Sequence, residues 1–194
     1  VRDELRLELQ PSAELRADAA AGLDARAFDG HGPGLPAPPE HQAGGGDGAP
    51  AALGRLVGFG ALLRWQHPEE GLLMPDRFVE QAEGSGLLHP LGVWTLQAAA
   101  KWLGDGHARG LHPPPVSVKV LPRQLLHPGF VDIVRGVMGE AGLPPGSLQL
   151  QMAEAALAAA SEPLLAALEA VRATGVGLTI DRVGTGSSSL VALA

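Results

Sequence analysis

Polar side chains stand where the predicted strands end, and they are the residues best suited to do chemistry in this chain. The set comprises Gln10, Arg64, Lys119, Gln151, Glu154, Asp181 and Arg182. Because the carboxyl ends of parallel strands meet at one edge of a sheet, we expect these side chains to lie near one another. Only Glu154 and Asp181 are acidic, whereas a hard divalent cation takes several oxygen ligands. The set therefore argues against a metal centre, and ordinary polar strand ends are the alternative interpretation.

The strand that carries Arg64 contains an unexpected glycine. Residues 57–64 read VGFGALLR, in which every second residue from Val57 to Leu63 is apolar. This alternation predicts a strand with one face in a core. Glycine weakens the interior of a strand, so Gly60 needs an explanation of its own.

Strand and helix patterns alternate along most of the chain. Strands are expected at 5–11, 56–64, 115–120, 147–154 and 176–183, and helices at 75–86, 91–104, 130–142, 163–175 and after 184. Gly104, Gly142 and Gly175 are expected to end three of these helices. Such alternation indicates parallel strands joined by crossover helices, so the fold class is α/β, a TIM-barrel-like (β/α) fold. A complete barrel takes about 250 residues, so five strands are expected to form an incomplete one.

A Gly- and Pro-rich stretch separates the first strand from the rest. Residues 30–50 are almost all Gly, Pro, Ala and polar residues, a composition that cannot offset the entropy of ordering it. We expect one domain over 1–194, with a flexible insertion at 12–54 and the main region at 55–194. A short helix at Ala13–Ala21 is a further expectation.

Composition excludes several classes of protein. The net charge of −7 argues against binding a nucleic acid polymer. With no Cys among the 194 residues, disulfides and zinc–thiolate sites are excluded. The chain contains no run of about 18 apolar residues, the length that a membrane-spanning helix needs, and a cytoplasmic location is expected. His67, His89, His112 and His127 each precede a proline, and we expect them in turns.

Several motifs, in order and at plausible spacing, resemble the EAL domains of bacterial cyclic-di-GMP signalling. They are LELQP, ALLRWQHPEEGLLMPDRFVEQAEGSGLL, LGVWTLQAAAKW, VSVKVLPRQL and IDRVGTGSSSL. The resemblance implies a (β/α)₈-type barrel that uses Mg²⁺ or Mn²⁺ to hydrolyse cyclic di-GMP to a linear dinucleotide. It also implies that the chain stops before the later family motifs.

The departures from the family pattern fall on its metal-binding positions. The resemblance places Gly60 where the family has the Glu of E-A-L, Lys119 where it has Asn, and Gln151 where it has Glu. Arg182 replaces the second Asp of an Asp-Asp pair, and Asp181 keeps the first. A metal hydrolase needs its cation to activate water. We therefore expect no metal cofactor and no enzymatic activity, and Gly60 marks a lost ligand.

Ligand binding is a separate expectation. By resemblance, Arg64 contacts a ligand phosphate, a charge-assisted interaction that needs no metal, and Gln10 and Pro75 lie near the dinucleotide pocket. Lys119 and Arg182, beside Asp181, are fixed positive charges that can replace the cation. The leading hypothesis is an inactive cyclic-di-GMP receptor or a module that binds a protein partner or itself. A weak phosphodiesterase and a truncated structural remnant are the alternatives.

Overall fold

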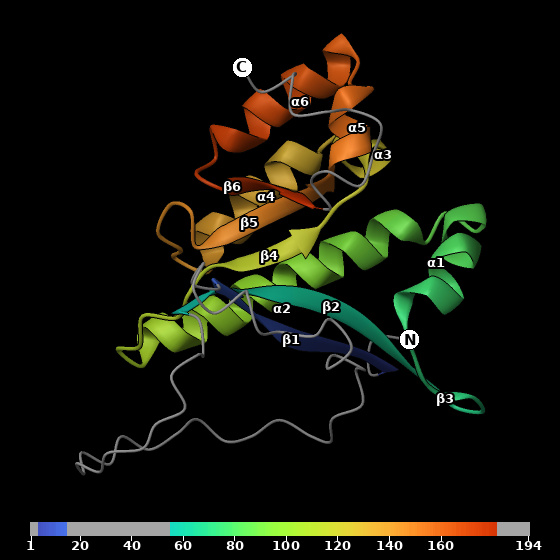
Figure 1. Ribbon diagram of the computed structural model, residues 1–194, viewed down its shortest axis with the longest axis horizontal. Coiled ribbons are helices and arrows are strands. Elements are labelled where there is room, and N and C mark those ends of the chain that lie inside the picture. The colour runs from blue at the N-terminus through green and yellow to red at the C-terminus, as the bar shows by residue number, and fades with distance from the viewer. Residues whose placement is uncertain (1–3, 15–54, 182–194) are drawn as a thin grey trace, which may run out of the picture. The chain divides into compact units, whose positions relative to one another are not determined.

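A computed structural model describes residues 4–14 and 55–181 of the chain (Figure 1). The strands are β1 (Leu5–Glu14), β2 (Arg55–His67), β3 (Gly71–Leu73), β4 (Val116–Lys119), β5 (Leu148–Ala153) and β6 (Gly177–Asp181). The helices are α1 (Pro75–Gly84), α2 (Leu88–Ala108), α3 (Pro122–Leu125), α4 (Phe130–Glu140), α5 (Glu154–Ala158) and α6 (Glu162–Arg172). Contacts divide the chain into two units, and the larger one, Val1–Ser12 with Val57–Ala194, contains nearly all of the described structure.

The described strands form one mixed sheet in the order β1-β2-β4-β5-β6, and β3 pairs with β2. β2, β4, β5 and β6 pair in parallel, whereas β3 runs antiparallel to β2 as a short hairpin. The register places Gly60 opposite Ser117 and Lys119 opposite Gln151. The predicted α/β class with a parallel sheet is confirmed.

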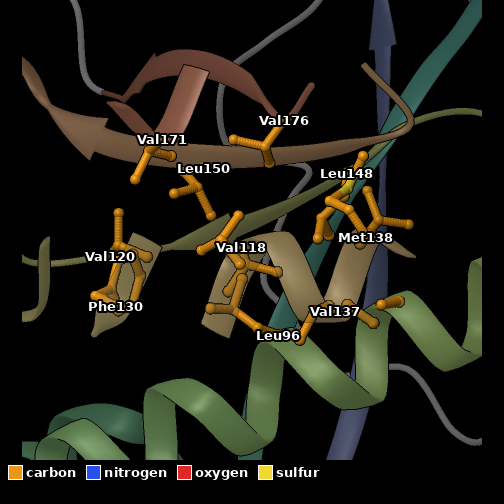
Figure 2. Packing of buried hydrophobic residues seen from close by; sticks show 14 of the residues in the cluster. Leu96, Val118, Val120, Phe130, Val137, Met138, Leu148, Leu150, Val171 and Val176 are labelled. Carbon is orange, nitrogen blue, oxygen red and sulfur yellow. The ribbon is translucent and has the colours of Figure 1, made fainter. Parts of the chain in front are cut away.

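One face of this sheet is packed against helices. The buried strand residues Val118, Leu148 and Leu150 lie against helical residues such as Leu96, Phe130 and Val171 (Figure 2). Side chains of this size contribute about 1.5–3 kcal/mol each when fully buried. Successive residues of a strand point to opposite faces, so burying these side chains fixes which face of each strand is turned towards the helices.

The opposite face of the sheet carries the polar residues. Strand residues between the buried ones, such as Ser117, Gln149 and Gln151, are only partly buried. Ser117 Oγ donates a 2.9 Å hydrogen bond to Gln149 Oε1 on the neighbouring strand. The alternation that buries one set of side chains therefore presents the other set together on a single surface.

Four local expectations were wrong or incomplete. Gly104 does not end α2, which continues to Ala108. A Cβ at Gly104 would lie 3.0 Å from the Ala141 carbonyl oxygen, so the glycine instead allows α2 to approach the end of α4. β3, α3 and α5 were not expected, since elements of three to five residues are too short to show a period. The sheet therefore has six described strands, not five. β1 continues to Glu14, beyond the expected start of the insertion and into the expected helix at Ala13–Ala21.

Other predictions fall outside the described residues. These concern residues 15–54 of the insertion expected at 12–54, residue Arg182 and the helix expected after 184. Within the described ranges, no helix is long and apolar enough to cross a membrane.

Candidate functional site

Lys119 and Asp181 form an ion pair at the carboxyl ends of two strands. Lys119 Nζ lies 3.1 Å from Asp181 Oδ2. Lys119 ends β4 and Asp181 ends β6, so the lysine side chain crosses the intervening strand β5. The Asp181 side chain is 27% exposed and that of Lys119 is 53% exposed, which leaves the ammonium accessible to a ligand. The site thus holds a positive charge at a position where an Asp would otherwise attract a cation.

The backbone at Gly60 leaves room for a side chain that the sequence does not supply. The nearest atom to a Cβ built at Gly60 is the Gln10 carbonyl oxygen, 3.9 Å away. Gly60 is therefore not required by a close backbone contact or by a left-handed conformation. Its register partner Ser117 lies two residues before Lys119, so a side chain at 60 would stand near the ammonium.

The residues at the implied metal positions do not fit a divalent cation. Gly60 has no ligand atom, Gln151 is uncharged, and Lys119 already neutralises Asp181. Among the described residues, no three His, Asp or Glu side chains gather in a way that could hold a metal ion. A metal centre would need hard oxygen ligands that these positions lack.

Arg64 is buried and paired with a carboxylate that sequence reasoning missed. Arg64 is 6% exposed, and its Nη2 lies 2.6 Å from Glu8 Oε2 on β1. Its Nη1 donates a 3.2 Å hydrogen bond to the Leu63 carbonyl oxygen. A buried guanidinium needs such a counter-charge. Glu8 lies two residues before Gln10 in the alternating strand LRLELQ, but nothing in the sequence paired it with Arg64.

The other described residues of the predicted set differ in element and in burial. Gln10 is exposed on β1, and Gln151 and Glu154 are half-buried at the end of β5 and the start of α5. Pro75, at the start of α1, borders a cavity of about 300 Å³. Lys119 also borders this cavity, whose other walls include the apolar residues Leu62, Leu63, Val79 and Leu91. The cavity is therefore bordered by the positive charge of Lys119 and by a largely apolar wall.

Two histidines form a contact that the sequence did not reveal. The rings of His89 and His127 stack with centroids 3.6 Å apart and planes 18° apart. His89 lies in helix α2 and His67 is the last residue of strand β2, so the expectation of a turn was wrong for both. His127 lies in the turn after α3, as expected. Burial, and then the neighbouring His127, lowers the pKa of the His89 imidazole. His89 Nδ1 is buried without a hydrogen-bond partner in the described part of the chain.

The fold and these residues define a barrel-type (β/α) domain with its polar residues at the carboxyl ends of the strands. The family model of the EAL domain matches residues 50–194. The chain belongs to the EAL domain family, and the predicted family and TIM-barrel-like fold are thereby confirmed.

Relatives in sequence support this assignment. The chain is 42% identical over 140 residues to the uncharacterized protein Rv1357c of Mycobacterium tuberculosis, which covers 72% of this chain and 46% of that protein. It is 38% identical over 147 residues to MucR of Pseudomonas aeruginosa, a bifunctional diguanylate cyclase/cyclic di-GMP phosphodiesterase, covering 74% of this chain and 21% of MucR. The chain thus spans less than half the length of these relatives.

Solved structures show the same fold. The PaMucR phosphodiesterase in complex with c-di-GMP matches with a TM-score of 0.72 and 31% identity, covering 99% of this chain and 63% of that one. The EAL domain of Xanthomonas citri FimX in complex with c-diGMP matches with a TM-score of 0.60 and 25% identity, covering 68% and 51%.

Proposed function

We propose that this EAL domain binds cyclic di-GMP without a metal ion and does not hydrolyse it. The observation that carries the proposal is the ion pair between Lys119 Nζ and Asp181 Oδ2. The family resemblance assigns both positions to metal binding, and here one is an ammonium that neutralises the other. The domain would act as a receptor in bacterial signalling.

The argument against hydrolysis is electrostatic. A metal hydrolase relies on its cation to lower the pKa of a bound water and to stabilise the charge that develops on the phosphate. An ammonium beside Asp181 can stabilise negative charge on a ligand, but it has no open coordination position and cannot activate water in this way. Gly60 and Gln151 supply no carboxylate that could replace the lost function.

The argument for binding rests on two cations and a cavity. Arg64 and Lys119 offer charge-assisted hydrogen bonds to phosphate oxygens. The cavity of about 300 Å³ beside Lys119 has largely apolar walls, which suits a planar base. Two structural neighbours, PaMucR and the X. citri FimX EAL domain, were solved in complex with c-di-GMP, which supports the same ligand for this chain.

A second candidate function is a weak phosphodiesterase. It is favoured by the names of two relatives, MucR and the cyclic di-GMP phosphodiesterase NbdA of P. aeruginosa, which are 38% and 40% identical to this chain. Such activity would require a rearranged site in which Lys119 leaves Asp181.

Calorimetric titration with cyclic di-GMP, in Mg²⁺, in Mn²⁺ and in chelator, tests the proposal, together with chromatography of the ligand after incubation. We expect the same dissociation constant in all three conditions and no linear dinucleotide. Binding that disappears in chelator would show that a metal ion holds the ligand, and linear product that forms only with metal would establish the phosphodiesterase instead. Absence of binding in every condition would overturn the receptor function.

A further inference from the structure

We infer that Glu8 sets the affinity of this domain for its ligand, because the Glu8 carboxylate occupies the side of Arg64 that a phosphate needs. The inference rests on the proposed function in one respect: it takes Arg64 as a phosphate-binding residue. The new element is a competing anion within the chain: the Glu8 carboxylate and the ligand phosphate bind the Arg64 guanidinium in turn.

Both terminal nitrogens of Arg64 have partners within the chain. The residue is 6% exposed, and Nη1 is directed to the Leu63 carbonyl oxygen on its own strand. Nη2 is directed to Glu8 Oε2 at 2.6 Å. The Glu8 side chain is 52% exposed, so the carboxylate lies between the buried guanidinium and solvent. A ligand that approaches from solvent therefore meets Glu8 before it meets Arg64.

A carboxylate and a phosphodiester compete for the same donor. Both present oxygen atoms that accept charge-assisted hydrogen bonds from a guanidinium. Both are anionic, so they repel each other at short distance, most strongly where water is partly excluded. Because this repulsion disfavours two anions at one nitrogen, we expect the ligand to displace Glu8 from Nη2.

The two partners differ in their freedom to move. Arg64 is buried, whereas Glu8 is half-exposed on β1, at one end of the described strand order. Glu8 can rotate into solvent, where its charge is hydrated, and Arg64 cannot follow. In the free protein Glu8 supplies the counter-charge that a buried guanidinium requires. Only an anionic ligand can replace that charge, so Glu8 also selects against neutral nucleosides.

The variant Glu8→Gln tests the inference because it keeps the size of the side chain and removes the competing charge. We expect cyclic di-GMP to bind about tenfold more tightly than to the wild type, which corresponds to about 1.4 kcal/mol. The control is Asp105→Asn, which removes an exposed carboxylate from an ion pair with Lys101 on α2 and should leave the affinity unchanged. Equal or weaker binding by folded Glu8→Gln would overturn the inference.

A second measurement separates this inference from the proposed function. If neither protein binds cyclic di-GMP, the receptor function fails, and inorganic phosphate becomes the probe of Arg64. We expect phosphate, compared with chloride at equal ionic strength, to raise the melting temperature of Glu8→Gln more than that of the wild type. An equal rise in both proteins would refute the exchange. Should Glu8→Gln not fold, Glu8→Asp retracts the carboxylate, and the same larger response to phosphate is expected.

Discussion

The ammonium of Lys119 reaches across strand β5 to the carboxylate of Asp181, 3.1 Å away and 62 residues later in the chain. A pair of this exposure contributes little to stability, about 0.2–1 kcal/mol. Its consequence is chemical: it places a covalently attached cation where the family resemblance implies a bound metal. A tethered charge cannot be removed by a chelator, and that difference is open to experiment.

Replacing Lys119 by Ala should weaken the binding of cyclic di-GMP about tenfold. A hydrogen bond to a charged group is worth about 1.5–3 kcal/mol, and the lower end applies because Lys119 is half-exposed. Calorimetry measures the change. Lys101→Ala is the matched control, since it also breaks an exposed Lys–Asp pair but on the surface of α2. If Lys119→Ala binds as the wild type does, the ammonium does not contact the ligand.

Arg64→Ala should reduce the affinity by about one to two decades, in chelator as well as in Mg²⁺. The buried guanidinium is prearranged by the Leu63 carbonyl oxygen, so its loss removes both a charge and an oriented donor. The double variant Glu8→Gln/Arg64→Ala should show no gain in affinity over Arg64→Ala alone. A gain of the size seen in Glu8→Gln would mean that Glu8 acts through general repulsion and not through Arg64.

A metal site should return only when several positions change together. Gly60→Glu places a carboxylate in open space, but the register brings it near Lys119, so we expect a second ion pair and no binding of Mn²⁺. The triple variant Gly60→Glu/Lys119→Asn/Gln151→Glu supplies carboxylate and amide oxygens beside Asp181 and should bind Mn²⁺ at least about tenfold more tightly than the wild type. The electron paramagnetic resonance signal of free Mn²⁺ measures the affinity of each variant for the ion. Strong binding by Gly60→Glu alone would show that Lys119 does not protect Asp181.

The sequence was sufficient for those parts of the fold that rest on local periodicity. Alternation around Ala61 predicted a strand with one buried face, and a strand was also expected at 115–120; Ala61 and Val118 are both buried. Gly142 and Gly175 were expected just beyond helices and have φ values of +58° and +93°, which favour glycine. Gly104 looked similar in sequence but serves the contact with Ala141, which only the packing of two helices reveals.

The candidate site could be predicted only by residue type. The sequence placed Lys119 and Gln151 near the carboxyl ends of two predicted strands, and the structure pairs them there. The partners of these charges depend on register and strand order across long stretches of chain. Glu8 is 56 positions before Arg64, and no local pattern links the two. Pairings of this kind follow from the folded sheet.

Gly92 should be intolerant of a methyl group. A Cβ at Gly92 would clash with Gln124 Nε2. Gln124 is buried, donates to the Leu88 carbonyl oxygen at 3.0 Å, and accepts from the Leu121 amide at 2.9 Å. Displacing it would break both hydrogen bonds, each worth about 0.5–1.5 kcal/mol.

We therefore expect Gly92→Ala to lower the free energy of unfolding by about 1–2 kcal/mol, measured by urea denaturation. Gly136→Ala is the control, because no atom lies within 4 Å of a Cβ at that position of α4. It should stabilise the protein by about 0.5–1 kcal/mol through the helix preference for Ala. If Gly92→Ala were as stable as Gly136→Ala, Gln124 would not be held as the structure describes.

The stacked pair His89 and His127 should make the domain less stable in mild acid. The folded state lowers the pKa of His89 from 6.5 through burial and the neighbouring His127. Below pH 6.5 the unfolded chain therefore binds a proton that the folded chain resists, so the free energy of unfolding falls as the pH decreases towards the lowered pKa. Above that range both states are neutral and the effect vanishes.

Replacing His89 by Gln removes this titration and should reduce the loss of stability between about pH 8 and pH 5. Urea denaturation at several pH values measures the free energy of unfolding. The decrease of this free energy with pH is then compared between the variant and the wild type. His112→Gln is the control, since His112 is exposed and follows α2 outside the stacked pair. His127→Gln should have an intermediate effect, because it removes the neighbouring charge but leaves His89 partly buried. Identical pH profiles for wild type and His89→Gln would mean that the stacked ring accepts its proton as readily in the folded protein as in the unfolded chain.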